Sequence, residues 1–237
     1  MENKSPFSDY SDISAEAGFI KERYARRKNN EVYDTLGEYF YYNFLSVNER
    51  DLKLASIIKS KFGFTYDLKM LEIGAGAGNN LLFFKRIGFN WRNIFANELL
   101  EDRSLILKEN FPSSIVHSGN AVELNYKEYF DIVFQSTVFT SILRPEIKKM
   151  LADKMFAMTK PGGIILWYDF MYNNPSNKDV KGVGKSEVRA LFSDALKIDI
   201  YPVTLAPPIG RRIGKFYPVV NFIFPFLRTH LIAVIHK

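Results

Sequence analysis

Cysteine is absent from all 237 residues of the chain. Without a thiol, the protein has no disulfide bond, no thiolate-bound metal, no iron–sulfur cluster and no cysteine nucleophile. Long apolar runs are missing as well, since no stretch reaches the roughly 18 uninterrupted apolar residues of a membrane-spanning helix. The first residues lack the positive start and the apolar middle of a signal peptide. From these absences we expect a cytoplasmic location.

Acidic residues are outnumbered by basic ones, 26 to 32, which gives a formal net charge of +6. An excess of this sign is compatible with an anionic partner. The basic residues are scattered, however, and the densest cluster, at residues 21–28, is typical of the exposed face of a helix. No recognisable RNA-binding or DNA-binding module is present, so we do not expect a nucleic-acid partner.

The hydrophobic content of 47% and the charged content of 24% are ordinary for a globular protein. Strand-like and helix-like segments alternate, which predicts a mainly parallel sheet with helices on both faces and a ligand at the carboxyl ends of the strands. Two helices are expected between residues 14 and 62, after a loose leader at residues 1–12. The expected strands are 69–73, 93–98, 114–117, 130–136, 164–169, 196–205 and 228–237, and the later helices are 80–86, 101–110, 145–158 and 186–192.

The rest of the chain is organised around residues 69–81, KMLEIGAGAGNNL, where an apolar strand breaks into a glycine-rich turn and leads into a helix. Gly74, Gly76 and Gly78 allow a close approach of the backbone to a ligand, because a Cβ atom would block the ligand or the required positive φ. The helix dipole favours a carboxylate or phosphate at the same place. We expect a cofactor here, and the alternative is a tight turn whose glycines serve only packing.

A dinucleotide fingerprint of the form G-x-G-x-x-G fails at its last position, where the chain has Asn79. A second nucleotide-binding feature is present. Glu98 ends the second expected strand about 24 residues after Gly74, and a carboxylate at that place can accept both hydroxyls of a ribose.

Four features, in this order and spacing, resemble the class I S-adenosylmethionine-dependent methyltransferases over about residues 65–237. They are the loop Leu71-Glu-Ile-Gly-Ala-Gly76, the ribose acid Glu98, the adenine loop Gly119-Asn-Ala121 and the hinge Lys160-Pro-Gly-Gly163. The resemblance implies an α/β, Rossmann-like fold with a seven-stranded, mostly parallel sheet of order 3-2-1-4-5-7-6 and an antiparallel strand 7. It also implies an N-terminal helical cap or lid at residues 1–64, with Tyr24 folding over the cofactor, and a methyltransferase domain at residues 65–237.

The resemblance names S-adenosyl-L-methionine as the cofactor and no metal. The chain differs from the family pattern at one position, because the family usually has Asp where this chain has Asn120. The amide oxygen of Asn120 still accepts a hydrogen bond, which is weaker than that of a carboxylate. The residues expected to bind the cofactor are Glu72, Gly74, Ala75, Gly76, Glu98, Leu99, Asn120, Ala121, Gln135 and Ser136. Those expected to contact the substrate are Thr137, Tyr168, Tyr172 and Asn173.

Methyl transfer to a hydroxyl requires alignment of the reactants and removal of a proton. Asp169 ends the fifth expected strand and is our candidate for the general base or a substrate anchor, although an Asp after a strand also commonly caps a turn. His117 is expected to be structural. His230 and His236 belong to the last strand, where pairing and packing explain them more simply.

The sequence after the fourth strand is not the Asn/Asp-Pro-Pro-aromatic box of methyltransferases that act on amino groups. We therefore favour O-methylation of a hydroxyl on a small molecule or glycan precursor. The alternatives are methylation of a lipid-like quinone or an RNA, and a non-catalytic module of the same fold that binds a partner protein.

Residues 207–228 contain the apolar run Val219–Leu227 flanked by Arg211, Arg212, Lys215 and Arg228. Such a segment suits weak contact with a membrane surface or a lipid-linked substrate. A helix packed over the sheet is the simpler alternative.

Overall fold

The computed structural model describes residues 6–29, 37–174 and 177–237. Its centre is a seven-stranded sheet of order β3-β2-β1-β4-β5-β7-β6, in which the first five strands run parallel and β7 is antiparallel to both neighbours. This confirms the predicted fold. The strands are β1 (Met70–Ile73), β2 (Ile94–Glu98), β3 (Ile115–Ser118), β4 (Phe130–Ser136), β5 (Thr159–Phe170), β6 (Lys197–Leu205) and β7 (Arg228–His236).

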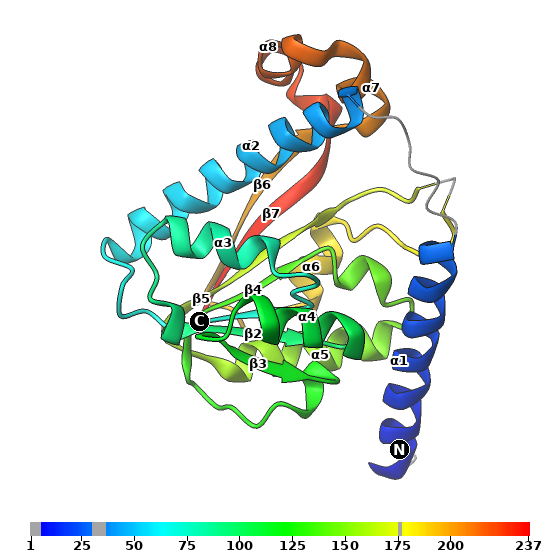
Figure 1. Ribbon diagram of the computed structural model, residues 1–237, viewed down its shortest axis with the longest axis vertical. Helices are drawn as coiled ribbons and strands as arrows, with labels where there is room; N and C mark the ends of the chain where they lie inside the picture. Colours follow the sequence, from blue (N-terminus) through cyan, green and yellow to red (C-terminus); the bar gives the residue numbers. More distant parts are fainter. Residues whose placement is uncertain (1–5, 30–36, 175–176) are drawn as a thin grey trace.

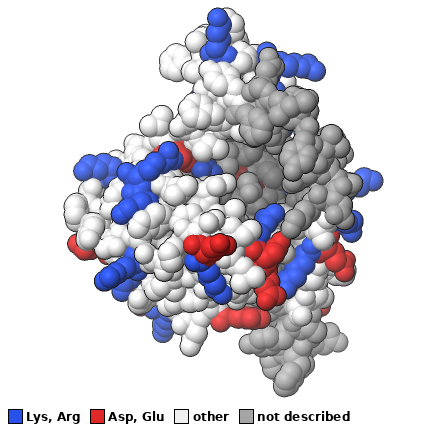
Figure 2. Space-filling view, in the orientation of Figure 1, with Lys and Arg blue, Asp and Glu red and all other residues white. Residues whose placement is uncertain are grey.

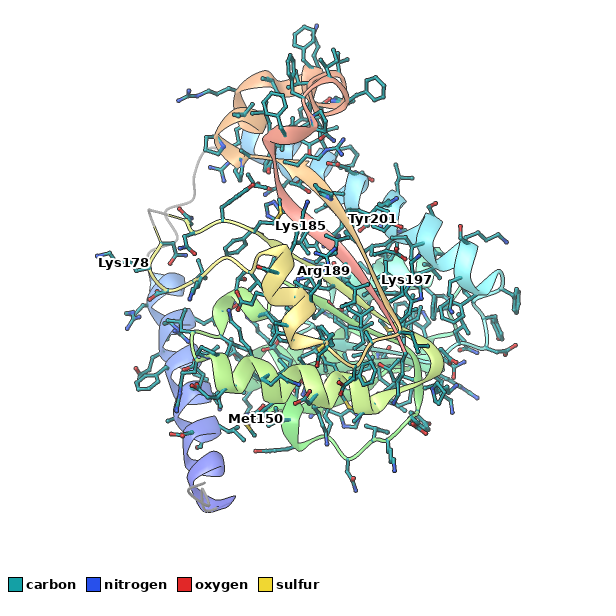
Figure 3. All side chains as sticks on the ribbon, turned by 180° about the vertical axis from the view of Figure 1, so that it is seen from behind. Met150, Lys178, Lys185, Arg189, Lys197 and Tyr201 are labelled. Carbon is teal, nitrogen blue, oxygen red and sulfur yellow. The ribbon has the colours of Figure 1, made fainter. Side chains whose placement is uncertain are left out.

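Helices cover both faces of this sheet (Figure 1). They are α1 (Pro6–Asn29), α2 (Gly37–Phe62), α3 (Asn79–Arg86), α4 (Glu101–Asn110), α5 (Pro145–Met158), α6 (Lys185–Leu191), α7 (Pro207–Ile213) and α8 (Tyr217–Ile223). Alternate residues of β5 supply the two cores, because side chains alternate across a strand. Ile165 and Trp167 pack with α5 and α6, whereas Ile164 and Leu166 pack with α2, α3 and α4. Seen from the other side, α6 lies over the sheet with Lys185 and Arg189 on it (Figure 3).

The two N-terminal helices differ in their relation to the core. In α2, Leu54 and Ile58 are fully buried in one cluster with Met70 of β1 and Phe84 of α3. The other helix, α1, runs along one side of the molecule near α5 and adds Ile13 to the opposite cluster (Figure 1). α2 therefore packs as part of the sheet domain, and the division of the chain after residue 64 stays a prediction.

Two local expectations need correction. The leader was expected to be loose through residue 12, but α1 begins at Pro6; residues 1–5 lie outside the described part. The hinge before the fifth strand lies inside β5, which begins at Thr159 because Thr159 pairs with Phe130. A register shift between Phe130 and Ile132, together with Gly162 at φ 77°, accommodates the hinge within the strand.

The segment 207–227 does not lie over the sheet. It folds as α7, a 3-10 turn at Gly214–Phe216, α8 and a second 3-10 turn at Pro225–Leu227. These short elements project beyond the ends of β6 and β7, next to the start of α2 (Figure 1). Within the described residues, no helix combines the length and apolar content that crossing a membrane requires.

Candidate active site

A cavity of about 450 Å³ lies at the carboxyl ends of β1, β2 and β4. Parallel strands bring these ends to one edge of the sheet, where ligands bind in this class of fold. The cavity contains eight of the ten residues predicted to bind the cofactor, and Glu72 and Gln135 do not line it. The eight are Gly74, Ala75, Gly76, Glu98, Leu99, Asn120, Ala121 and Ser136.

The three glycines of the turn all have positive φ angles, 68° at Gly74, 59° at Gly76 and 87° at Gly78. A Cβ atom at Gly74 would lie 2.6 Å from a methyl carbon of Val138, and one at Gly78 would lie 2.3 Å from the ring of Phe111. A Cβ atom at Gly76 would meet no protein atom within 4 Å and would enter the cavity. Gly74 and Gly78 therefore serve protein packing, whereas Gly76 keeps space open for a ligand.

Glu98 is held by the backbone on both of its carboxylate oxygens. The amide of Gly76 donates to Oε2 at 2.7 Å, and the amide of Leu100 donates to Oε1 at 2.8 Å. Each oxygen can accept a further hydrogen bond, because a carboxylate has about four lone-pair sites. The side chain is oriented before a ligand arrives and lines the cavity.

Asn120 uses its side chain to begin a 3-10 turn at Ala121–Glu123. Its Oδ1 accepts from the amide of Val122 at 3.2 Å. The same oxygen is the acceptor expected for an adenine amino group, and one lone pair remains for it.

Two charged residues of α2 enter this cavity, and sequence reasoning missed both. Arg50 donates to Asp51 Oδ1 through Nε at 3.0 Å and through Nη2 at 2.8 Å. Nη2 also donates to Asn80 Oδ1 at 2.8 Å. The available signal was the spacing of Arg50, which lies four residues before the buried Leu54 and so shares its helix face.

Glu72 lies behind the glycine turn and is fully buried. Asn80 Nδ2 donates to its Oε1 at 2.6 Å, while Oε2 has no hydrogen-bond partner among the described residues. Burial raises the pKa of Glu72 to about 7, and the bond from Asn80 opposes this shift. Glu72 thus positions the first turn of α3 through Asn80.

A second cavity, of about 650 Å³, lies beside the first. The two share Tyr24, Thr137 and Ser141 in their walls. Three of the four residues predicted to contact the substrate, Thr137, Tyr172 and Asn173, line the second cavity.

Thr137 occupies an unusual backbone conformation at this junction, with φ 59°. A β-branched residue rarely adopts a positive φ, and such strain is found most often at functional sites. The amide of Thr137 donates to the carbonyl of Tyr168 at 2.9 Å, which helps to hold this conformation.

Asp169 does not reach either cavity, contrary to its expected role as a base. It is fully buried and accepts from Thr140 Oγ1 at 2.7 Å, from the Thr140 amide at 3.3 Å and from the Phe170 amide at 3.1 Å. Burial raises the pKa of Asp169 to about 7 against these hydrogen bonds. Because Thr140 lines the second cavity, Asp169 acts on that cavity as a positioning residue.

Tyr168 and Gln135 are likewise behind the cavity walls. The hydroxyl of Tyr168 lies 3.1 Å from Thr204 Oγ1, and burial raises its pKa to about 12. Gln135 Oε1 accepts from the amide of Val138 at 3.0 Å, and Nε2 donates to the carbonyl of Tyr168 at 3.4 Å. Both side chains hold the ends of β4 and β5 in place rather than facing a ligand.

His230 lines the second cavity, although the sequence suggested only pairing and packing for it. Its ring stacks on Tyr168 with centroids 5.3 Å apart, and Nδ1 lies 3.2 Å from Thr229 Oγ1. Burial lowers the pKa of His230 to about 4, so the imidazole is neutral at physiological pH. No sequence signal marks this position, because β7 brings it to the site from the far end of the chain.

The other two histidines are outside both cavities. His117 Nε2 lies 3.0 Å from the hydroxyl of Tyr126, and His236 Nε2 lies 3.2 Å from Asp199 Oδ2. Among the described residues, no group of three or more His, Cys, Asp or Glu side chains is placed to hold a metal ion.

Helix α1 closes the two cavities from one side. Arg23 Nη2 donates to Glu16 Oε1 at 3.0 Å and to the carbonyl of Ser141 at 3.1 Å, and both charged side chains are buried. Tyr24 lies under the guanidinium of Arg103, with 4.7 Å from Cζ to the ring centroid. Glu16, Tyr24 and Arg103 all line the first cavity, as a lid would.

Comparisons with known proteins bear on the family and the fold of the chain. Residues 71–167 match the family model described as a methyltransferase domain, and no curated protein matches the chain. The matched segment runs from β1 to β5, covers 97 of the 237 residues, and supports the predicted resemblance to the class I S-adenosylmethionine-dependent methyltransferases. The protein is a methyltransferase, and S-adenosylmethionine is its cofactor.

Solved structures share the fold at low identity. The 1,6-didemethyltoxoflavin-N1-methyltransferase of Burkholderia thailandensis, solved with S-adenosylhomocysteine, is 14% identical with a TM-score of 0.59, covering 100% of this chain and 92% of that one. A methyltransferase of Methanosarcina mazei is 14% identical with a TM-score of 0.55, covering 76% and 96%. The cyclase SpnF is 12% identical with a TM-score of 0.54, covering 78% and 80%. The same fold therefore serves different reactions.

The residues of the first cavity fit this cofactor. The open space beside Gly76 accepts a ligand that a Cβ atom would exclude. The two oriented oxygens of Glu98 suit the two hydroxyls of a ribose.

Proposed function

We propose that the protein methylates a hydroxyl of a small molecule or glycan precursor that binds in the second cavity. The observation that carries this proposal is the shared wall of the two cavities at Tyr24, Thr137 and Ser141. An acceptor in the second cavity would lie next to the reactive end of a cofactor in the first.

The cofactor is an amino acid at one end and a nucleoside at the other, and the first cavity offers matching groups. Arg50 and Asp51 pair with each other and suit the carboxylate and the ammonium of the amino-acid end. Glu98 suits the ribose, and Asn120 the adenine. When bound, the cofactor supplies an electrophilic methyl group on a positively charged sulfur.

The walls of the second cavity favour a neutral acceptor over a cationic one. No Asp or Glu side chain of the described residues lines it, and Arg211 adds a positive charge. An ammonium group would therefore lack a counter-ion there. Tyr172, Asn173 and Asn174 offer neutral donors and acceptors of the kind that bind hydroxyl groups.

The imidazole of His230 is the candidate group that accepts the proton of the acceptor hydroxyl. It is neutral, so when Nδ1 donates to Thr229 Oγ1 the other ring nitrogen, Nε2, is an acceptor, and the ring belongs to the wall of the same cavity. This assignment replaces Asp169 as the candidate base.

The test measures transfer of a labelled methyl group to matched panels of hydroxylated and amine acceptors, with the linkage in each product read by NMR. We expect methyl ethers as products. The substitution His230→Gln should lower kcat and change KM much less. Products that are exclusively N-methylated, or undiminished turnover by His230→Gln, would refute the O-methylation or the base assignment respectively.

The alternatives use the same assay. A quinone or an RNA as the acceptor would reassign the substrate, and tight binding of S-adenosylhomocysteine without transfer to any acceptor would favour the non-catalytic module. This proposal also includes a cytoplasmic location and the absence of a nucleic-acid partner. The mixed signs of charge on the face drawn in Figure 2 support the absence of a nucleic-acid partner. Cell fractionation and a gel-shift assay test these two points.

A further inference from the structure

The segment 207–227, which we call the tip, exposes an unusual amount of apolar surface. Phe222 is 83% exposed and Phe226 is 75% exposed. Figure 3 shows aromatic rings of the tip pointing away from the rest of the molecule. The exposed large apolar side chains of the tip are Phe216, Val219, Phe222, Ile223, Phe224 and Phe226. So many exposed large apolar side chains on one short segment indicate an interaction site.

The charges of the tip are all of one sign. Residues 207–227 contain Arg211, Arg212 and Lys215 and no Asp or Glu, although the whole chain has 26 acidic residues. Arg212 and Lys215 are exposed. On the face drawn in Figure 2, the projecting end shows basic side chains among uncharged ones.

The tip is a folded platform rather than a loose end. Tyr217 is buried against Tyr42 of α2 with ring centroids 5.9 Å apart, and its hydroxyl donates to Glu49 Oε2 at 2.6 Å. Arg228 closes the other end, since Nε donates to Asn221 Oδ1 at 2.8 Å. The buried residues Tyr217 and Asn221 anchor the tip, so its exposed rings are not needed for the core.

We propose that the tip docks on the surface of an anionic lipid bilayer. Aromatic and aliphatic side chains insert between headgroups and acyl chains, and nearby Lys and Arg side chains are attracted to anionic lipids. An anionic bilayer matches both features of the tip, because inserted apolar side chains and exclusively basic charges around them are what such a surface binds. The projection of the tip beyond the sheet also allows it to reach a flat surface without obstruction by the body (Figure 1).

Docking would bring the second cavity close to the bilayer. Pro207, Pro208 and Arg211 of α7 line that cavity, while Arg212 of the same helix is exposed. This consequence rests on the proposed acceptor site, and it favours an acceptor that partitions to a membrane surface. The docking itself does not depend on which acceptor is methylated.

The test is co-sedimentation of the full chain with vesicles of phosphatidylcholine alone and of phosphatidylcholine mixed with phosphatidylglycerol. We expect the protein to pellet with the anionic vesicles and to stay in the supernatant with the neutral ones. Phe222→Ser with Phe226→Ser, and separately Arg212→Glu with Lys215→Glu, should each lower the partition coefficient by at least about tenfold. Raising the salt concentration should also weaken the binding of the wild-type protein to the anionic vesicles.

Matched controls are available elsewhere on the surface. Leu196 is 82% exposed outside the tip, and Lys127 is exposed between β3 and β4. Leu196→Ser and Lys127→Glu should leave the partition coefficient unchanged. All variants should keep the wild-type melting temperature and affinity for S-adenosylhomocysteine, which separates a failed docking from a failed fold or cofactor site.

Three outcomes would overturn the proposal: equal partition into both kinds of vesicle, partition that the tip variants leave unchanged, and absence of partition. In the last case size-exclusion chromatography identifies the other occupant. A dimer that Phe222→Ser with Phe226→Ser dissociates would show that a second copy of the chain covers the tip. If vesicle binding fails while S-adenosylhomocysteine still binds and methyl transfer proceeds, the proposed function stands without the docking.

Discussion

The two adjoining cavities are built in opposite ways. One side of the first is made of short stretches at the ends of neighbouring strands, 73–77 and 79–80 at β1, 97–100 at β2 and 136–138 at β4, and residues of α1, α2 and α5 complete its walls. The second takes small contributions from α1, from the region around Thr140, from the loop after β5, from α7 and from β7. A site made of strand ends leaves a pattern in the sequence, whereas a site assembled from distant elements leaves almost none.

The physical reason is the geometry of the parallel sheet. Hydrogen-bonded strands place their carboxyl ends at fixed spacing along one edge, so a carboxylate at the end of β2 must lie near the turn after β1. No comparable constraint links Tyr172 to His230. Their meeting depends on how β7 pairs with β5 and on where the loop after β5 settles.

The largest expected effect is on the first cavity alone. Glu98→Ala removes two acceptor atoms for the ribose and also leaves the amides of Gly76 and Leu100 without their acceptor. Hydrogen bonds to a charged group contribute roughly 1.5–3 kcal/mol each, so affinity for S-adenosylhomocysteine should fall by about a hundredfold or more. Isothermal titration measures this, with Glu101→Ala, an exposed acid of α4, as the control. An unchanged affinity would exclude Glu98 as the ribose acid.

The glycines of the turn separate packing from binding. Gly78→Ala should destabilise the fold by several kcal/mol, because the new Cβ would lie 2.3 Å from the Phe111 ring at a positive φ. Gly76→Ala meets no protein atom and should cost about 1 kcal/mol for its left-handed backbone. Binding of S-adenosylhomocysteine should nevertheless be lost in Gly76→Ala.

Urea denaturation measures the stability of the two glycine variants, and isothermal titration measures their affinity for S-adenosylhomocysteine. If Gly76→Ala bound the ligand as tightly as the wild type, the space beside Gly76 would not belong to the cofactor.

His230 makes a pH-dependent contribution to stability that its removal should reveal. Its folded pKa of about 4 lies below the ordinary value of 6.5, so the unfolded chain binds its proton first as the pH falls. The contribution of His230 to the free energy of unfolding is therefore complete above about pH 6.5 and is lost as the pH falls from about 6.5 to 4. Its size is on the order of 2 kcal/mol, because the ring is partly exposed to a cavity.

The measurement is the free energy of unfolding of the wild type and of His230→Gln across this pH range. The difference between the two should change with pH in the stated direction, while the contributions of Glu72 and Asp169 cancel. A constant difference would mean that the imidazole is not buried as described.

Thr140 should connect Asp169 to the second cavity in a pH-dependent way. Thr140→Val removes the hydroxyl that donates to Asp169 Oδ1 at 2.7 Å. The free energy of unfolding should fall by about 1–3 kcal/mol above pH 8, where the carboxyl of Asp169 is ionised. The fall should be smaller at pH 6, because the pKa of Asp169 is about 7. Thr140→Ser keeps the donor and is the control. Equal losses at both pH values would contradict the buried carboxylate.

The smallest expected effect concerns the lid. Tyr24→Leu removes the ring beneath the guanidinium of Arg103, a contact of about 0.5–1 kcal/mol. Affinity for S-adenosylhomocysteine should fall by about twofold to fivefold, and Tyr24→Phe should restore most of it. Equal affinities of Tyr24→Leu and Tyr24→Phe would show that the ring does not cover the cofactor.

The sequence by itself determined the fold and the strand ends that form one side of the first cavity. The alternation of apolar strands and helices predicted a mainly parallel sheet, and the resemblance to the methyltransferases added its strand order. The spacing from Gly74 to Glu98 predicted a ribose-binding acid at the end of the second strand, and in the structure that carboxylate accepts from the amide of Gly76. Such features are local, since each depends on a strand, the turn after it and the fixed register of the next strand.

Only the tertiary structure decided the second cavity and the roles of several polar residues. It buried Asp169 behind Thr140, brought His230 into the cavity wall, and inserted Arg50 of α2 beside the glycine turn. Burial and partners depend on elements far apart in the chain, and a residue type carries no information about which of them will cover it. Strand ends follow from local pairing rules, whereas pockets between distant elements follow from the packing of the whole molecule.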